Sequence, residues 1–174
     1  MRTLRPLDVA RDAAALHAVY GDTQSCTYLS HEAFDSVAET RVQLETWTAG
    51  LEALSWAVID PPDGEALGRV ALVPVRPEVF EVAVMLVPAA AGRGLAFRAM
   101  GEALDHAFDA LGARRVEADI DPDNRASVSL FTRLGFASEG RLRAAWRTHL
   151  GVRDTLLMGL LAADPRPWHR ARPT

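Results

Sequence analysis

The chain has 174 residues, of which 49% are hydrophobic and 24% charged, the balance of one globular domain with its own core. Its net charge of −4 argues against nucleic acid as the main partner, and its 19 basic residues are all arginines, which excludes lysine Schiff-base chemistry. With no apolar run near the ~20 residues that span a bilayer, no secretion signal and Cys26 as the one cysteine, we expect a cytoplasmic protein that binds no membrane.

Hydrophobic spacing and turn residues then predict alternating elements along the chain. In order, these are a strand at 2–7, helices at 8–20 and 31–50, strands at 55–60, 66–75 and 79–87, a helix at 95–111, a strand at 114–121, a helix at 125–134, and strands at 136–147 and 152–161. Helix ends are expected at Gly50, Gly112 and Gly135, and residues 165–174 should form a loose tail. The order βααβββαβαββ predicts an α+β fold around one mixed sheet, with residues 1–174 as a single domain.

The stretch 81–96 is the most informative part of the chain. An apolar strand pattern ends at Pro88, a loop with Gly92 and Gly94 follows, and an amphipathic helix pattern starts at Leu95. The first N–H groups of a helix have no partner within the helix, and the helix dipole favours negative charge there, so this arrangement predicts a cradle for a phosphate or pyrophosphate. A plain structural turn is the alternative. The loop lacks the third glycine of a dinucleotide-binding fingerprint and the lysine of a P-loop.

Further motifs follow the loop in order. They are the strand 81–86 followed by a proline, the loop 91–96, an Asn-Arg-Ala-Ser helix start at 124–127 with a Leu-Gly-Phe end at 134–136, and Glu-Gly-Arg-Leu-Arg at 139–143. Together they resemble the GNAT superfamily of acyl-CoA-dependent N-acyltransferases, and most of all its RimJ/RimL-like branch. The first position of the loop signature, usually Arg or Gln, is Ala91 here.

The resemblance implies a mixed, mostly antiparallel seven-stranded sheet, in which strand 84–87 runs parallel to strand 116–120 and splays away from it. Acetyl-CoA would be the co-substrate, held in the V-shaped cleft with its pyrophosphate on the loop N–H groups, and no metal is implied. The implied cofactor-binding residues are Met85, Leu86, Val87, Ala91, Gly92, Arg93, Gly94, Leu95, Ala96, Asn124, Ser127 and Phe131. Two of them have a second interpretation, because Arg93 can be a solvated loop charge and Asn124 can simply cap its helix.

The implied reaction is direct acetyl transfer to a neutral amine without an acyl-enzyme. Ser127 is the candidate donor of a proton to the leaving thiolate, because Phe131 stands where many family members carry a tyrosine. Glu81 is the first choice for the general base, and a solvent-facing strand carboxylate is its alternative.

The acceptor side is less defined. Tyr28, His31 and Trp146 are candidate substrate-binding residues, and ordinary packing or exposure is an alternative for each. The acceptor stays open among a peptide N-terminus, a polyamine, an aminoglycoside and an amino acid. A non-catalytic acyl-CoA sensor and a scaffold protein are the competing functions, and both a monomer and a homodimer are consistent with the sequence.

Overall fold

The computed structural model describes residues 2–50, 53–62 and 64–169. Its elements follow the predicted order. They are β1 (Leu4–Pro6), α1 (Val9–Tyr20), α2 (Val37–Thr48), β2 (Leu54–Val58), β3 (Gly68–Arg76), β4 (Val79–Leu86), η1 (Pro88–Ala90), α3 (Leu95–Asp105), η2 (His106–Ala110), β5 (Arg115–Ile120), α4 (Arg125–Arg133), β6 (Ala137–Thr148), β7 (Gly151–Leu161) and η3 (Pro167–His169). The predicted α+β class with one mixed sheet is confirmed.

All seven strands form one sheet in the order β1-β2-β3-β4-β5-β7-β6. Only β4 and β5 run parallel, and the other neighbours are antiparallel. The parallel ladder is short, because residues 79–81 pair with 115–117 and no pairs follow. Both strands continue past this point, so they splay apart as expected, and the V opens toward their C-terminal ends.

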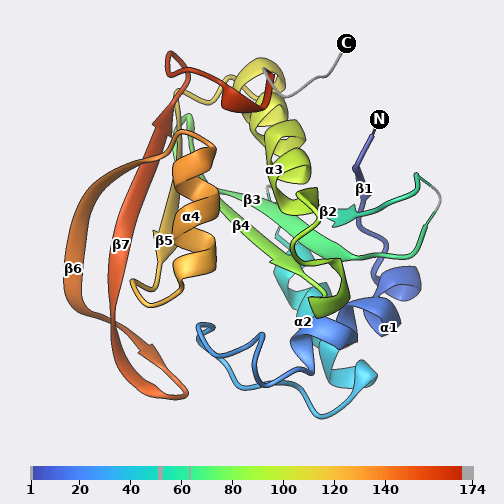
Figure 1. Cartoon of the computed structure of the whole chain (residues 1–174). Helices are drawn as coiled ribbons and strands as arrows, with labels where there is room; N and C mark the ends of the chain where they lie inside the picture. The colour runs from blue at the N-terminus through green and yellow to red at the C-terminus, as the bar shows by residue number, and fades with distance from the viewer. Residues whose placement is uncertain (1, 51–52, 63, 170–174) are drawn as a thin grey trace.

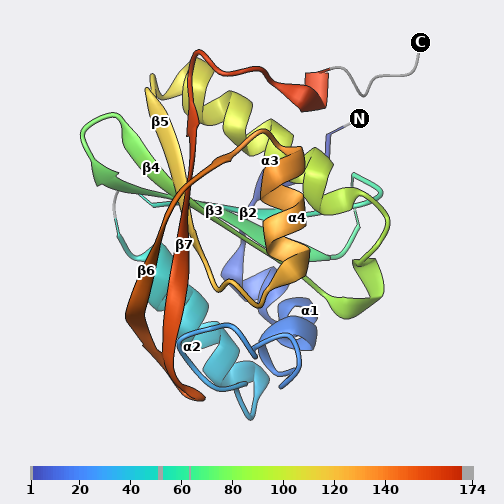
Figure 2. The same ribbon diagram turned by 60° about the vertical axis from the view of Figure 1, so that its left-hand side comes forward.

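Helices cover both faces of the sheet. Helices α1 and α2 lie on one face, and α3 and α4 lie on the other (Figures 1 and 2). Leu16 and Leu44 are fully buried under the first face, and Met100 and Leu104 under the second. Burial of such side chains on both sides stabilises the sheet by roughly 1.5–3 kcal/mol for each large apolar residue. This fixed frame holds the splayed strands in place.

The second helix begins later than predicted. We expected it over 31–50, but α2 starts at Val37, after a cap in which Ser36 Oγ accepts the N–H of Glu39 at 3.2 Å. Glu39 Oε2 in turn accepts the N–H of Asp35 at 3.0 Å, which completes a capping box. Residues 31–35 are drawn out of the helix because the Phe34 N–H bonds the carbonyl of Tyr20. At the other end Ala49 is the C-cap and Gly50 follows it directly, so the helix ends where predicted.

Residues 165–169 are also more ordered than expected. Residues 165–169 do not form a loose tail, since Arg166 makes two bonds of 2.8 Å to Asp109 and Trp168 Nε1 donates to Asp105 at 3.0 Å. Residues 170–174 lie outside the described part of the chain. The helix predicted over 95–111 is regular only to Asp105 and widens into one π-type turn, η2, before Gly112. None of the described helices is long and apolar enough to cross a membrane.

Candidate functional site

The loop between β4 and α3 has the backbone that an anion cradle needs. Gly92 and Gly94 have φ angles of +76° and +70°, which L side chains rarely adopt. Gly94 is the N-cap of α3, and no side chain caps this helix. The first N–H groups of α3 are therefore free of intrahelical partners at a place where a phosphate could approach them.

A cleft of about 310 Å³ opens between this loop, the splayed end of β4 and helix α4. Its lining consists of Val84, Leu86, Ala91, Gly92, Gly94, Leu95, Ala96, Phe97, Ala126, Ser127, Leu130 and Arg133. Seven of the twelve predicted cofactor-binding residues are among them: Leu86, Ala91, Gly92, Gly94, Leu95, Ala96 and Ser127. The β4 wall of the cleft is apolar, whereas the α4 wall carries the polar side chains of Ser127 and Arg133. The loop contributes backbone N–H groups, and this mixture fits a ligand with a thioester arm and a diphosphate.

The other predicted cofactor residues lie around the cleft without lining it. Val87 is buried and its N–H bonds the carbonyl of Leu67, and Met85 pairs with Arg69 in β3. Phe131 is 3% exposed and packs edge-on against Phe136, so its ring belongs to the core. Its side chain can support α4 but does not face the cleft.

Asn124 caps α4 as its alternative interpretation predicts. Its Oδ1 accepts the N–H of Ser127 at 3.2 Å. The cap fixes the first turn of α4, and Ser127 in that turn reaches the cleft wall. Asn124 thus acts on the cleft through the helix that carries Ser127.

Arginines gather at the loop end of the cleft. Arg93 Nη2 lies 3.0 Å from Asp60 Oδ2, and Arg98 Nη2 lies 3.9 Å from the same oxygen. About half of each arginine side chain is exposed, so these pairs contribute little to folding and leave donors for a phosphate. The guanidinium of Arg133 lies over the ring of Phe97 at 5.1 Å, on the cleft wall.

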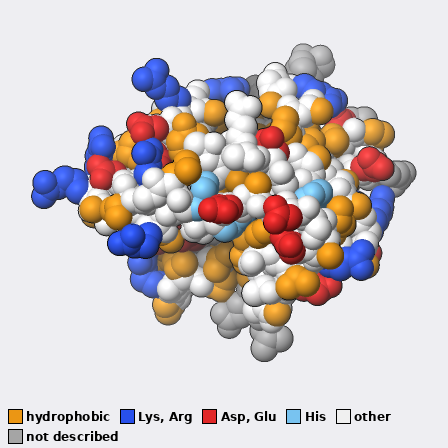
Figure 3. All heavy atoms as spheres, turned by 90° about the horizontal axis from the view of Figure 1, so that it is seen from below, with side chains coloured by type: hydrophobic (Ala, Val, Ile, Leu, Met, Phe, Trp, Pro, Cys, Tyr) orange, Lys and Arg blue, Asp and Glu red, His pale blue; other side chains and the backbone are white. Residues whose placement is uncertain are grey.

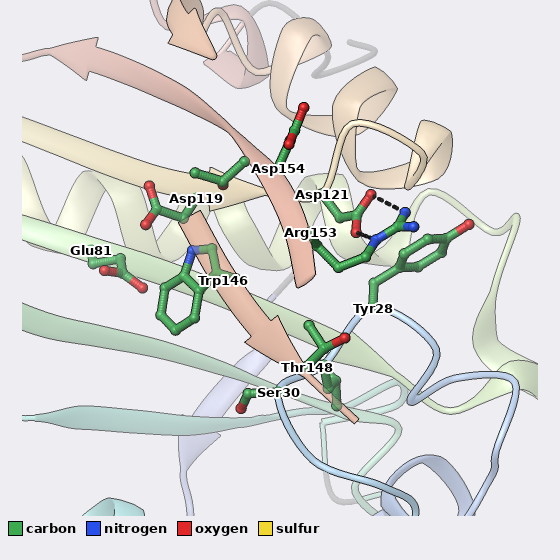
Figure 4. A pocket seen from close by; sticks show the side chains of 11 residues that line it. Tyr28, Ser30, Glu81, Asp119, Asp121, Trp146, Thr148, Arg153 and Asp154 are labelled. Atoms are coloured by element: carbon green, nitrogen blue, oxygen red, sulfur yellow. Dashed lines mark hydrogen bonds and ion pairs between the residues drawn. The ribbon is translucent and has the colours of Figure 1, made fainter. Parts of the chain in front are cut away.

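A second cavity, of about 160 Å³, lies on the opposite face of the splayed strands (Figure 4). It is lined by Tyr28, Leu29, Ser30, Glu81, Asp119, Asp121, Trp146, Thr148, Arg153, Asp154 and Thr155. The two hollows lie on opposite faces because successive residues of a strand point to opposite sides: Glu81 faces this cavity, whereas Val84 and Leu86 face the cleft. Seen from below, the molecule carries acidic side chains near the centre of the view and arginines mostly toward its rim (Figure 3).

Three separate segments build this cavity, and they bring three predicted residues together. Glu81 comes from β4, Trp146 from β6 and Tyr28 from the loop between α1 and α2, held by a hydrogen bond of 3.2 Å to the carbonyl of Asp123. His31 does not join them. Its ring stacks on Phe34 at 4.6 Å, away from the cavity lining.

Two carboxylates of the cavity have raised pKa values. Burial, and then the charges of Asp119 and Glu117, raise the pKa of Glu81. Burial and Glu117 likewise raise the pKa of Asp119, against a hydrogen bond from Trp146 that lowers it. Within the described part of the chain, no arginine or histidine lies within 4.0 Å of either carboxylate.

The remaining charges of the cavity are neutralised within the protein. Arg153 pairs with Asp121 at 2.7 Å and with Asp123 at 2.6 Å, and Arg141 pairs with Asp154 at 2.7 Å. The sequence analysis did not predict these ion pairs of the cavity. The signal was weak, because their members are ordinary surface charges until β5 and β7 are placed side by side.

Cys26 is buried and its thiol faces backbone carbonyls of α1, so it does not reach either hollow. Burial, and then the charge of Asp22, raise the pKa of this thiol, which makes it a poor nucleophile. Among the described residues, no three His, Cys, Asp or Glu side chains are arranged to hold a metal ion.

Comparison with known proteins gives consistent matches. The family model described as an acetyltransferase (GNAT) domain matches residues 2–137. The chain is 26% identical over 167 residues to the uncharacterized N-acetyltransferase p20 of Bacillus licheniformis, covering 93% of each chain. It is 33% identical to the spermidine N(1)-acetyltransferase of Escherichia coli over 82 residues, which is 46% of this chain and 44% of that protein.

Among solved structures, a probable GNAT-family acetyltransferase from Chromobacterium violaceum superimposes with a TM-score of 0.85 at 28% identity, covering 97% of this chain and 86% of that one. The seven-stranded sheet and its parallel central pair therefore agree with a fold already seen in experiment.

Proposed function

The chain belongs to the GNAT acetyltransferase family and is an acetyl-transferring enzyme, and from this premise we propose that it passes the acetyl group of acetyl-CoA directly to a primary amine. One observation carries the proposal. The cleft and the cavity lie on opposite faces of β4 and β5, next to the point where these strands part. A donor in the cleft and an acceptor in the cavity would meet between the strands.

Family members use acetyl-CoA, and the cleft has room and chemistry for it. The N–H groups of the Gly92–Gly94 loop and the first turn of α3 would bind the pyrophosphate. Arg93 would add a charged hydrogen bond in exchange for its exposed pair with Asp60. The pantetheine arm would lie along β4 beyond Glu81, where the backbone edge toward β5 has no ladder partner.

The proposed transfer uses three groups of the chain. The Glu81 carboxylate takes a proton from the acceptor ammonium, and the resulting neutral amine attacks the acetyl carbonyl. Backbone N–H groups of β4 around Leu86 stabilise the oxyanion. The carbon–sulfur bond then breaks, and Ser127 supplies a proton to the leaving thiolate of coenzyme A and recovers one from solvent. The nitrogen loses its second proton to solvent and is left as an acetamide, and Glu81 releases its proton to solvent before the next turnover.

The acceptor is a primary amine, and its exact identity belongs to this proposal. The match to a spermidine acetyltransferase favours a small amine. The proposed RimJ/RimL-like branch would instead favour a protein N-terminus. Family membership favours an enzyme over the competing interpretation, a non-catalytic acyl-CoA sensor.

The test is an amine panel with free-thiol detection, run beside thermal unfolding with acetyl-CoA. We expect thiol release with at least one class of primary amine. We also expect stabilisation by acetyl-CoA, about 2.7 kcal/mol when the ligand is at 100 times its Kd. Stabilisation without thiol release across the panel would support the sensor, and no stabilisation at millimolar acetyl-CoA would refute the proposed cleft.

A further inference from the structure

A bulge in the edge strand β6 sets the position of Trp146. In the β6–β7 ladder, Leu142 pairs with Thr155 and Trp146 pairs with Arg153. Residues 143–145 of β6 are therefore opposite the single residue Asp154 of β7. Ala144 in the bulge has a φ of +53°, a conformation that a non-glycine residue adopts only when its surroundings hold it there. Bulges of this kind re-aim the side chains that follow them.

Asp154 holds the bulge in place. Its Oδ1 accepts the N–H of Ala144 at 2.8 Å, and its Oδ2 accepts Nε of Arg141 at 2.8 Å. These bonds lower the pKa of Asp154, so the carboxylate stays charged at neutral pH. Both of its oxygens are occupied, so Asp154 lines the cavity without offering a free charge to a ligand.

The bulge places an aromatic face in the cavity. Trp146 is 44% exposed, which is unusual for an indole, and it lies beside Asp119 and Glu81 in Figure 4. The indole nitrogen lies on the side of the ring toward Asp119 (Figure 4), where the side chain of Trp146 favours the charged form of that carboxylate. An indole face beside a carboxylate is a good environment for an ammonium group, because the ring attracts a cation and the carboxylate pairs with it.

Two carboxylates of the cavity indicate an acceptor with two amino groups. Glu81 and Asp119 are the cavity carboxylates without an arginine partner among the described residues. In the proposed transfer Glu81 removes the proton from the amine that reacts. A monoamine is neutral once it has lost that proton, so it has no positive charge to pair with the Asp119 carboxylate.

We propose that Trp146 and Asp119 form a subsite for a second, protonated amino group, so that the acceptor is a diamine or polyamine. This inference rests on the proposed acetyl transfer and narrows its acceptor. Trp146 and Asp119 bind the spectator ammonium, and Asp154 is a positioning residue that acts through the bulge.

The experiment compares kcat/KM for 1,4-diaminobutane and for n-butylamine, which share a carbon chain and differ in one amino group. We expect the enzyme to prefer the diamine about tenfold or more. Asp119→Asn and Trp146→Ala should bring this ratio close to one, whereas Trp146→Phe, which retains an aromatic face, should keep most of it. Asp154→Ala should lower the ratio through loss of the bulge. Glu65→Gln, which removes an exposed carboxylate outside the cavity, is the matched charge control.

The outcomes separate the two proposals. A ratio near one in the unmodified enzyme, with thiol release intact, overturns the diamine subsite and leaves acetyl transfer standing. A preference that survives Asp119→Asn and Trp146→Ala also overturns it. No thiol release from either amine, or from the wider panel, refutes the proposed function itself. Thermal unfolding of each variant shows whether a lost ratio comes from a lost fold, and the Trp146→Phe ratio remains a test if Trp146→Ala does not fold.

Discussion

Glu81 and Glu117 stand directly opposite each other in the last pair of the parallel β4–β5 ladder. Their surroundings differ. Glu117 Oε2 accepts bonds from Arg76 at 2.7 Å and from Arg115 at 2.9 Å, while Glu81 faces the cavity without such a partner among the described residues. Two like charges in register repel each other, and the arginines relieve only one of them. Burial, and then the charges of Asp119 and Glu117, raise the pKa of Glu81 at the point where the strands part.

Replacing Glu81 with Gln should lower kcat by more than tenfold, because loss of a positioned general base typically costs ~10²-fold or more. The KM for acetyl-CoA should change little, since Glu81 faces away from the cleft. In the unmodified enzyme kcat/KM should fall as the pH falls through the raised pKa of Glu81, because the protonated carboxyl cannot accept a proton. Wild-type turnover in the Glu81→Gln enzyme would remove Glu81 from the mechanism.

The same substitution should make the protein more stable at neutral pH. The folded pKa of Glu81 lies above the ordinary glutamate value of 4.5, so the folded state binds this proton more tightly than the unfolded state. Stability from this group is therefore lost as the pH rises from about 4.5 through the raised pKa. We expect Glu81→Gln to raise the Tm at pH 7 by a few degrees, of the order of 1–3 °C.

That gain in Tm should shrink as the pH approaches 4.5, the ordinary pKa of a glutamate side chain. The quantity to measure is the difference in Tm between variant and unmodified protein. The absolute Tm also falls in acid, because carboxylates with lowered pKa values, such as Asp121 and Asp154, lose their partners there. A Tm that drops on substitution at neutral pH would show that Glu81 supports the fold.

The order of elements and the cleft could be predicted from sequence because both rest on local signals. The glycines of the loop and the cap at Asn124 belong to short contiguous motifs. The cavity could not be predicted as a whole, because Tyr28, Glu81 and Trp146 come from three segments that only the fold brings together. The bulge at Ala144 also left no signal, since no glycine marks its positive φ.

A pair of glycines tests whether the loop binds the cofactor. Gly92 and Gly112 have similar φ angles of +76° and +66°, and an added Cβ would meet no atom within 4 Å at either position. Alanine should therefore destabilise the protein alike at both, by about 1 kcal/mol or ~2–4 °C in Tm. Only Gly92→Ala should also raise the KM for acetyl-CoA, because only Gly92 lines the cleft. Equal KM values for the two variants would count against a phosphate site at the loop.

The packing of residues 165–169 against α3 predicts that the effect of Gly101→Ala on stability changes sign when the Trp168 side chain is removed. A Cβ at Gly101 would lie 2.7 Å from Cγ of Trp168, too close for an ordinary contact, so Gly101→Ala should destabilise the protein or displace the 165–169 segment. Alanine is otherwise favoured over glycine inside a helix by about 1 kcal/mol. In a Trp168→Gly background, which removes both the ring and the Cβ that would lie 2.9 Å away, Gly101→Ala should therefore raise the Tm. A double-mutant cycle measured by thermal unfolding gives the change in Tm caused by Gly101→Ala in each background. Destabilisation in both backgrounds would mean that contacts other than Trp168 require the glycine.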